Sequence, residues 1–289
     1  MNTPVLAETE TLRLSPQCFH RLAELITRRL GIKMPDNKIS MLQSRLQRRL
    51  RALGLASYDE YMTYLLQSAD GERELAEFFD AVTTNKTDFF REPQHFDFLR
   101  RTALPALDHA PHHPWHVKLW CAGCSTGEEP YTLAMVLSEH AASREGFDFS
   151  ILATDISTHV LQTATEGIYD AARIEPVDEG LRKKYLLRGC TPGSRLIRVV
   201  PELRARVRFH ALNFMDAAYG LSDVFDAIFF RNVMIYFDKA TQQAVVEKLC
   251  ARLRPGGYLF IGHSESLIGL ELPLHMVAAA VYQKPSSGA

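Results

Sequence analysis

The chain has 289 residues, 46% of them hydrophobic, with 33 Lys and Arg against 34 Asp and Glu. This composition excludes a disordered chain, a collagen-like fibre and a uniformly basic nucleic-acid binder. No run approaches the roughly 18 apolar residues that a membrane span needs. The N-terminus carries Glu8 and Glu10 and lacks the apolar core of a signal peptide. We therefore expect a cytoplasmic protein without membrane insertion.

The charge is unevenly distributed along the chain. Residues 28–51 hold eight basic side chains against Asp36 alone, so the rest of the chain has a net charge of −8. A local basic block on a neutral protein is typical of a face that docks an acidic partner, and nucleic-acid phosphates are an alternative partner for it. The predicted docking residues are Arg45, Arg48, Arg49 and Arg51.

The first part of the chain has helical periodicity. Ser15, followed by proline, is a typical helix N-cap, and Gly31 is a typical helix end. A second helix is expected to end at Gly54, and Ser57 with Glu60 forms a capping box for a third. These signals predict an N-terminal all-α domain over residues 1–77, followed by a linker over 78–116 that contributes a cofactor-contacting segment.

The second part, residues 117–289, alternates short apolar runs with helical segments. This alternation predicts an α/β domain with a mostly parallel, Rossmann-like sheet. Residues 274–284 form a further apolar run reached without a helix, which we expect to be an antiparallel C-terminal edge strand. An over-long connection predicts a small β-subdomain insertion at about 183–206.

A glycine-rich turn follows the first predicted strand. Gly123 and Gly127 permit a tight turn and a close backbone approach to a ligand. The spacing is not the G-x-G-x-x-G fingerprint, and Glu128 and Glu129 would repel a pyrophosphate at the helix N-terminus. These acids suit a cofactor that carries hydroxyl and ammonium groups.

Polar residues also follow the next three strands. Asp155 ends the second strand, where a carboxylate can bind both ribose hydroxyls of an adenosine ligand, and Asn213 and Asn232 follow the third and fourth. Each residue alone is an ordinary turn or cap residue. Because ligands bind at the carboxyl ends of parallel strands, the set in register predicts a binding site there.

Four segments together resemble the signature blocks of the CheR family of chemoreceptor methyltransferases. They are TNKTDFFRE (84–92), AGCSTGEEPY (122–131), RNVMIYFD (231–238) and GHSE (262–265), in family order. The resemblance spans residues 15–284. It implies a class I methyltransferase fold and transfer of a methyl group from S-adenosyl-L-methionine to glutamate side chains on cytoplasmic helices of bacterial chemoreceptors, which leaves S-adenosyl-L-homocysteine.

The resemblance also implies roles for individual residues. The cofactor would be bound by Asn85, Thr87, Arg91, Glu129, Asp155, Asn213, Phe214, Asn232 and Val233, beside the close approach that Gly123 permits. From their chemistry, Arg91 is the candidate to orient a carboxylate by a bidentate contact, either the acceptor's or the cofactor's own, and Tyr236 is the candidate to position the acceptor. The β-subdomain in some members binds a C-terminal receptor peptide. Here Arg195 stands where peptide-binding relatives have glycine, which argues against such tethering. We expect a monomer.

The chemistry agrees with this implied acceptor. A glutamate carboxylate has a pKa of about 4.3 and is already ionised at neutral pH, so no general base is needed. A non-catalytic adaptor that binds the same cofactor is an alternative, and a nucleic-acid methyltransferase is another. Against the latter, the segment after the fourth strand begins Asn232-Val, whereas amino-directed enzymes of that group carry D/N-P-P-Y.

Two patterns resemble metal-binding motifs, but neither predicts a metal site. Cys121 and Cys124 have redox or zinc spacing, but no second pair exists, and the five cysteines of the chain are an odd number. We expect reduced thiols at Cys18, Cys121, Cys124, Cys190 and Cys250. The connector histidines 109, 112, 113 and 116 are interrupted by prolines, and His263 is expected to be structural, so no metal site is predicted.

Overall fold

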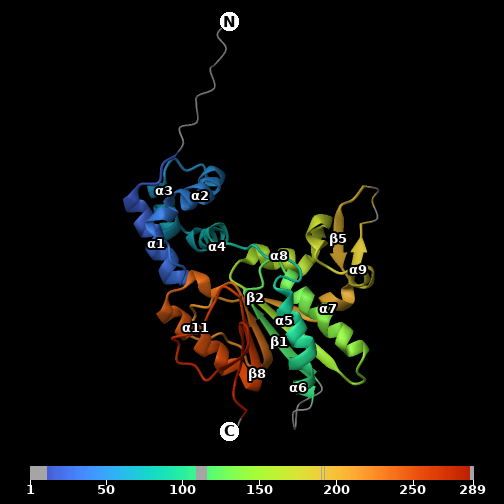
Figure 1. Cartoon of the computed structure of the whole chain (residues 1–289). Helices are drawn as coiled ribbons and strands as arrows, with labels where there is room; N and C mark the ends of the chain where they lie inside the picture. Colours follow the sequence, from blue (N-terminus) through green and yellow to red (C-terminus); the bar gives the residue numbers. More distant parts are fainter. Residues whose placement is uncertain (1–11, 109–115, 190, 192, 287–289) are drawn as a thin grey trace. The chain divides into compact units, whose positions relative to one another are not determined.

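The computed structural model describes residues 12–108, 116–189, 191 and 193–286. It contains two compact units, Met1–Thr83 and Thr84–Ala289 (Figure 1). Of the features predicted above, Cys190 and the histidines 109, 112 and 113 lie outside the described residues. Over the ranges described, no helix combines the length and the apolar character that a membrane crossing requires.

The N-terminal unit is built from four α-helices and one short 3₁₀ turn within its described part. They are α1 (Pro16–Leu30), η1 (Asp36–Lys38), α2 (Ile39–Leu53), α3 (Tyr58–Gln67) and α4 (Gly71–Val82). The predicted caps are confirmed, since the Ser15 side chain accepts the Cys18 N–H and Gly31 ends α1 with φ 70°. At α3 the Ser57 hydroxyl accepts the Glu60 N–H, and the Glu60 carboxylate in turn accepts the Ala56 N–H.

Helix α4 extends this unit to Thr83, beyond the boundary predicted at residue 77. Glu74, Phe78 and Val82 continue its buried face at four-residue spacing. The buried polar member, Glu74, is 4% exposed and holds the helices together. Its carboxylate accepts two N–H groups of Arg49, from Nε at 2.9 Å and from a terminal nitrogen at 2.5 Å, and also the Tyr61 hydroxyl at 2.8 Å.

This arrangement corrects the prediction of one exposed basic face on α2. Arg49 is also paired with Glu77 at 2.8 Å, and Arg45 donates to the carbonyls of Val82 and Thr83 at the end of α4. Of the four predicted docking residues, the exposed ones are Arg48 and Arg51. The prediction failed because α4 was not recognised, and α4 supplies both the acidic partners and the helix C-terminus that attracts a cation.

The Arg49–Glu74 pair leads to a stability prediction. Arg49→Ala leaves a buried carboxylate without its cation, which is expected to cost about 3–5 kcal/mol. Hydrogen exchange at α4 amides, followed by mass spectrometry, should therefore accelerate by about 100-fold or more. The neighbouring exposed change Arg48→Ala is the control and should stay within about 0.5 kcal/mol. Equal exchange rates in the two variants would contradict the proposed contribution of the Arg49–Glu74 pair to stability.

The C-terminal unit, from Thr84 onward, is a sheet with helices on both faces. In Figure 1, α11 lies on one side of the sheet and α5, α6 and α7 on the other. Its described helical segments are α5 (Pro93–Phe98), η2 (Leu99–Ala103), α6 (Leu104–Asp108), α7 (Glu128–Ala142), α8 (Thr158–Glu166), η3 (Ala171–Ile174), α9 (Glu179–Tyr185), α10 (Pro201–Arg204), η4 (Met234–Tyr236) and α11 (Lys239–Arg252). Part of the predicted 78–116 linker is thus helical, because Phe96, Leu99, Ala103 and Leu104 join the core.

The main sheet has the order β6-β2-β1-β7-β8-β10-β9. Its strands are β1 (His116–Ala122), β2 (Asp148–Asp155), β6 (Val207–Ala211), β7 (Phe225–Phe230), β8 (Leu253–Ile261), β9 (His275–Ala278) and β10 (Val281–Gln283). The five strands from β6 to β8 are parallel, and β10 is antiparallel to β8. The chain runs from β1 outward to β6 and then returns to β7 on the other side of β1. The strand order therefore reverses between β1 and β7, where ligands bind in sheets of this kind.

Two expectations about strands need correction. Residues 274–284 form a hairpin rather than one edge strand, because the chain turns at Ala280 with φ 57° and β10 enters the sheet between β8 and β9. The insertion begins before residue 183. Its antiparallel sheet has the order β3-β5-β4, with β3 (Ile168–Asp170), β4 (Leu186–Arg188) and β5 (Leu196–Val199). The three-residue β3 gives too short a pattern to be recognised from sequence.

Candidate cofactor site

The loop between β1 and α7 folds over the end of β2. The N–H groups of Gly123 and Cys124 donate to the Thr154 carbonyl at 2.7 and 2.9 Å. The Asp155 carboxylate, in a residue that is 8% exposed, accepts the N–H of Ser125 at 2.9 Å and of Ser157 at 3.0 Å. Each carboxylate oxygen can accept more than one hydrogen bond. Asp155 therefore both anchors the loop and can accept ligand hydroxyls.

Gly123 is required by the shape of this loop. Its φ is 85°, and a Cβ at this position would lie 2.6 Å from Cγ2 of Val233. The loop after β1 and the loop after β7 thus touch at a point where no side chain fits. Two of the sequence-predicted residues, Gly123 and Val233, are brought into contact here.

The segment 84–92 is bound to the same loops by hydrogen bonds. The Ser125 hydroxyl donates to the Asn85 carbonyl at 2.8 Å, and the Phe90 N–H donates to the Thr132 hydroxyl at 3.2 Å. The half-buried Arg91 uses one guanidinium N–H on the Lys86 carbonyl at 3.0 Å. The part of the chain predicted to contact the cofactor therefore lies beside the β1–α7 loop.

A buried guanidinium joins this segment to β7. Arg231, whose side chain is 1% exposed, forms ion pairs with Glu92 at 3.3 Å and Glu129 at 3.2 Å and donates to the Arg91 carbonyl. Burial alone would raise the pKa of the Glu92 carboxyl, but Arg231 and the N–H of His263 outweigh it, so this pKa lies below its usual range. Glu92 is consequently ionised at neutral pH and neutralises part of the Arg231 charge.

A second carboxylate organises the loops after β7 and β8. Glu265 accepts N–H groups from Gly262 at 2.7 Å, Asn232 at 2.9 Å and Ile235 at 3.2 Å. Burial raises the pKa of the Glu265 carboxyl, and these N–H groups oppose the rise. The Asn232 side chain reaches in the other direction and donates to Glu92 at 3.4 Å. Asn232 is therefore held from both its backbone and its side chain.

Strained backbone is concentrated in these loops. Five described non-glycine residues have positive φ, and four lie here: Phe90, Glu92, Ser125 and Asn232, with φ between 49° and 60°. Each such conformation costs on the order of 1–3 kcal/mol and persists only where surrounding contacts impose it. The hydrogen bonds of Phe90, Ser125 and Asn232 described above supply those contacts. These contacts hold the loops in conformations that the residues would not adopt by themselves.

The remaining predicted residues lie around the same edge of the sheet. The backbone of Leu212, next to Asn213, donates to the Asp155 carbonyl at 2.9 Å, and Asn213 accepts the Met215 N–H in its own turn. The Phe214 ring is mostly buried against Phe230. Thr87 and Tyr236 are the last two predicted residues. The Thr87 carbonyl accepts an N–H of Arg173, and the Tyr236 hydroxyl forms no hydrogen bond with a described residue.

The Cys121–Cys124 pair does not have the character of a redox motif. Both residues are at most 1% exposed, and burial raises the pKa of each thiol well above its usual value. The Cys121 thiol donates to Glu129 at 3.1 Å. Protonated, buried thiols are poor nucleophiles and poor metal ligands, so this pair serves packing.

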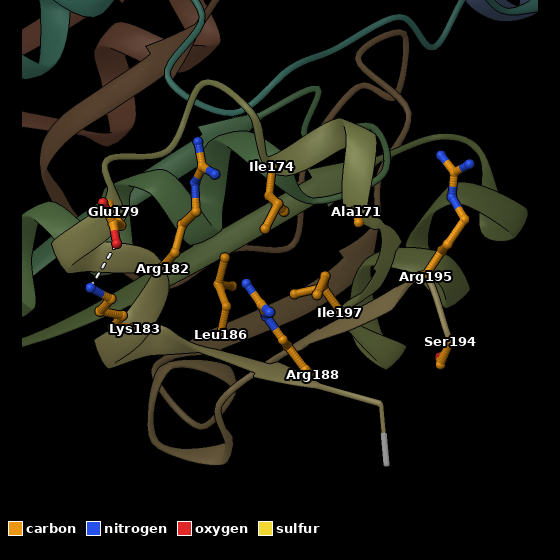
Figure 2. Close-up of a pocket in the computed structure, with 10 residues that line it drawn as sticks. All are labelled: Ala171, Ile174, Glu179, Arg182, Lys183, Leu186, Arg188, Ser194, Arg195 and Ile197. Atoms are coloured by element: carbon orange, nitrogen blue, oxygen red, sulfur yellow. Dashed lines mark ion pairs between the residues drawn. The ribbon is translucent and has the colours of Figure 1, made fainter. Parts of the chain in front are cut away.

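Figure 2 shows a hollow in the β-subdomain, with a volume of about 790 Å³. Its apolar lining includes Ile174, Leu186 and Ile197, and four basic side chains surround it. The Glu179–Lys183 ion pair lies at one end and Arg195 at the other. Arg195 is itself paired with Asp170 at 3.1 Å. Arg195 thus lies on the lining of this hollow.

Comparison with known families covers both units. Residues 17–83 match the family model of the CheR methyltransferase all-alpha domain, and residues 85–282 match that of the CheR methyltransferase SAM binding domain. The chain belongs to the CheR methyltransferase family. S-adenosyl-L-methionine, abbreviated SAM in that description, is accordingly its cofactor.

Curated relatives match over nearly the whole length. Chemotaxis protein methyltransferase 2 of Pseudomonas aeruginosa is 41% identical and covers 97% of each chain. Chemotaxis protein methyltransferase of Escherichia coli is 40% identical, over 96% of this chain and 94% of that one. Among solved structures, PKMT2 from Rickettsia typhi is 17% identical with a TM-score of 0.37, over 61% of this chain and 26% of that one, which is too remote to inform the fold.

The residues at the CheR site fit an adenosine-containing cofactor. The loop at Gly123 has no side chain where it approaches the β7 loop, and the Asp155 carboxylate stands at the end of β2. These are the two features that adenosine-binding sheets require.

The sequence did not assign roles to two carboxylates and one cation that organise this CheR site. Glu92, Arg231 and Glu265 lie within the signature blocks, so their signal was their place in those blocks. Glu128 is fully buried, accepts the Thr126 hydroxyl at 2.7 Å and pairs with Arg173 at 2.5 Å. This corrects the expectation that Glu128 suits a cofactor with hydroxyl and ammonium groups, because Arg173, from a distant segment, pairs with its buried carboxylate.

The close approach at Gly123 predicts a binding defect. Gly123→Ala adds a Cβ in conflict with Val233 and imposes positive-φ strain of about 1–2 kcal/mol. Affinity for S-adenosyl-L-homocysteine, measured by calorimetry, should fall at least about tenfold. Gly220→Ala has comparable φ strain but no atom within 4 Å of the new Cβ, so it is the matched control and should bind normally. A similar loss in both variants would show that strain alone is responsible.

Proposed function

We propose that this chain transfers a methyl group from S-adenosyl-L-methionine to glutamate side-chain carboxylates on the cytoplasmic helices of bacterial chemoreceptors. The observation that carries the proposal is the match to chemotaxis protein methyltransferases at about 40% identity over both full chains. The four signature blocks surround the described site, which supports the same conclusion.

The site geometry is consistent with an acceptor that needs no deprotonation. The cofactor supplies a methyl group activated by a sulfonium. A glutamate carboxylate is ionised at neutral pH, so the protein has to orient it and exclude water rather than remove a proton. The thiols of Cys121 and Cys124 are protonated and buried, which makes them unsuitable as bases.

Two residues are proposed to orient the acceptor. Arg91 has guanidinium N–H groups beyond the one used on Lys86, and a bidentate contact would position a carboxylate. Tyr236 is half-buried, and its hydroxyl has no partner among the described residues, so it can donate to the acceptor. Asn232 and Val233 would close the pocket, with Asn232 held by Glu265 and Glu92.

Docking is proposed to use the exposed basic residues of α2. Receptor methylation regions are acidic helical bundles, and Arg48 and Arg51 are exposed toward solvent. Arg45 and Arg49 support α2 from within the helical unit instead.

The methyl acceptor can be identified directly. Receptor cytoplasmic fragments incubated with this protein and radiolabelled S-adenosyl-L-methionine should acquire base-labile label on glutamate. Tyr236→Phe should lower kcat by about 10- to 100-fold if the hydroxyl orients the acceptor. Cofactor binding without any label would indicate an adaptor, and label on nucleic acid under the same conditions would contradict the proposal.

The ribose role of Asp155 predicts a specific loss of affinity. Asp155→Ala removes an acceptor for both hydroxyls, and binding of S-adenosyl-L-homocysteine should weaken by about 10- to 100-fold. The exposed Asp216→Ala is the control for a lost negative charge. Because Asp155 also holds the Ser125 loop, thermal unfolding is measured in parallel. Unchanged affinity would refute the ribose role.

A further inference from the structure

Two histidines and a carboxylate converge beside the cofactor site. Glu92 precedes α5, His95 lies in the first turn of α5, and His263 follows β8. One ligand atom of each lies within 4.8 Å of the other two. Glu92 and His263 are 171 positions apart, so the sequence gives no sign of the cluster and predicted no metal site.

His95 lacks the hydrogen bonds that a buried imidazole requires. Its side chain is 1% exposed, and neither ring nitrogen forms a hydrogen bond. The backbone of Ala279 acts on the ring as an acceptor, but the contact does not reach hydrogen-bond geometry. The rings of Phe260 and His263 pack edge-on against the His95 ring, with centroid distances of 5.7 and 4.5 Å. Unpaired buried polar groups are rare and often indicate an ion or water.

The carboxylate that faces His95 is also incompletely satisfied. Oε2 of Glu92 lies 3.5 Å from Nδ1 of His95 and forms no hydrogen bond. Arg231 approaches the same oxygen at 3.3 Å, but its charge is shared with Glu129. Glu92 and His95 therefore present donor atoms to a common point, and one shared guanidinium is the nearby cation among the described residues.

We propose that Glu92, His95 and His263 form a binding site for a divalent transition metal, with Zn²⁺ as the best-fitting ion. Two imidazoles and one carboxylate are a typical zinc donor set, whereas Ca²⁺ and Mg²⁺ prefer oxygen ligands. His263 is exposed, which leaves the fourth position accessible to water. The proposal does not depend on the methyl acceptor.

Metal binding would link two segments of the cofactor site. Glu92 and His95 belong to the segment that carries Arg91, and His263 belongs to the loop that carries Glu265. Glu265 holds the Asn232 backbone, so the ion would stabilise the loops on both sides of the pocket.

The test uses tag-free, chelator-treated full-length protein in which His109, His112 and His113 are replaced by alanine, so that any zinc binding arises elsewhere in the chain. Calorimetric titration with Zn²⁺ should give one site per chain. Zinc at a hundredfold excess over Kd should raise Tm by about 5 °C. Co²⁺ in its place should produce the visible absorption of a low-symmetry site.

His263 is exposed, so its substitution tests one ligand without disturbing the packed interior. His263→Ala should weaken zinc affinity by about 100-fold and abolish the rise in Tm, with the metal-free Tm unchanged. His210→Ala, an exposed histidine on β6, is the matched control and should bind as the parent does. Glu92→Gln should also weaken binding. Absence of saturable binding, or equal binding by the parent and His263→Ala, would overturn the proposal.

Discussion

The cofactor site depends on the burial of one charge. Arg231 is 1% exposed and lies between Glu92 and Glu129, with its guanidinium 5.4 Å from the centre of the Phe96 ring. These three partners belong to the segment before α5, the start of α7 and α5 itself. An ion pair of this kind adds little net stability over apolar packing, but loss of one partner is costly because it strands a buried charge. The pairing therefore joins the loop after β7 to two other segments, the stretch that carries Glu92 and Phe96 and the start of α7.

The loops around this charge are held in unfavourable conformations. Ser125 and Asn232 both have positive φ, and each is held by two hydrogen bonds to other segments. The sheet that carries these loops is closely packed, and the rings of Phe229 and Phe260 stack with their centroids 4.1 Å apart. A rigid pocket suits methyl transfer to an anion, since orientation and water exclusion are the main contributions that remain for the protein.

Much of the fold could be predicted because its signals are local. Ser15, Gly31 and Ser57 act through neighbours within four residues, and each cap was confirmed. The parallel strands were recognisable from alternation with helices. The C-terminal hairpin and β3 were not, because a turn at Ala280 and a three-residue strand leave no periodic pattern.

The sequence by itself determined the family, the cofactor class and the strand ends at which Asp155, Asn213 and Asn232 would stand. These are properties of order along the chain. Only the tertiary structure decided which charges are paired. Arg49 pairs with Glu74 rather than forming part of an exposed docking face, Arg231 pairs with Glu92 and Glu129, and Glu92, His95 and His263 come together. The physical reason is that burial, neighbouring charges and hydrogen bonds determine the free energy of a charged side chain. Those neighbours come from segments up to 171 positions away in the sequence.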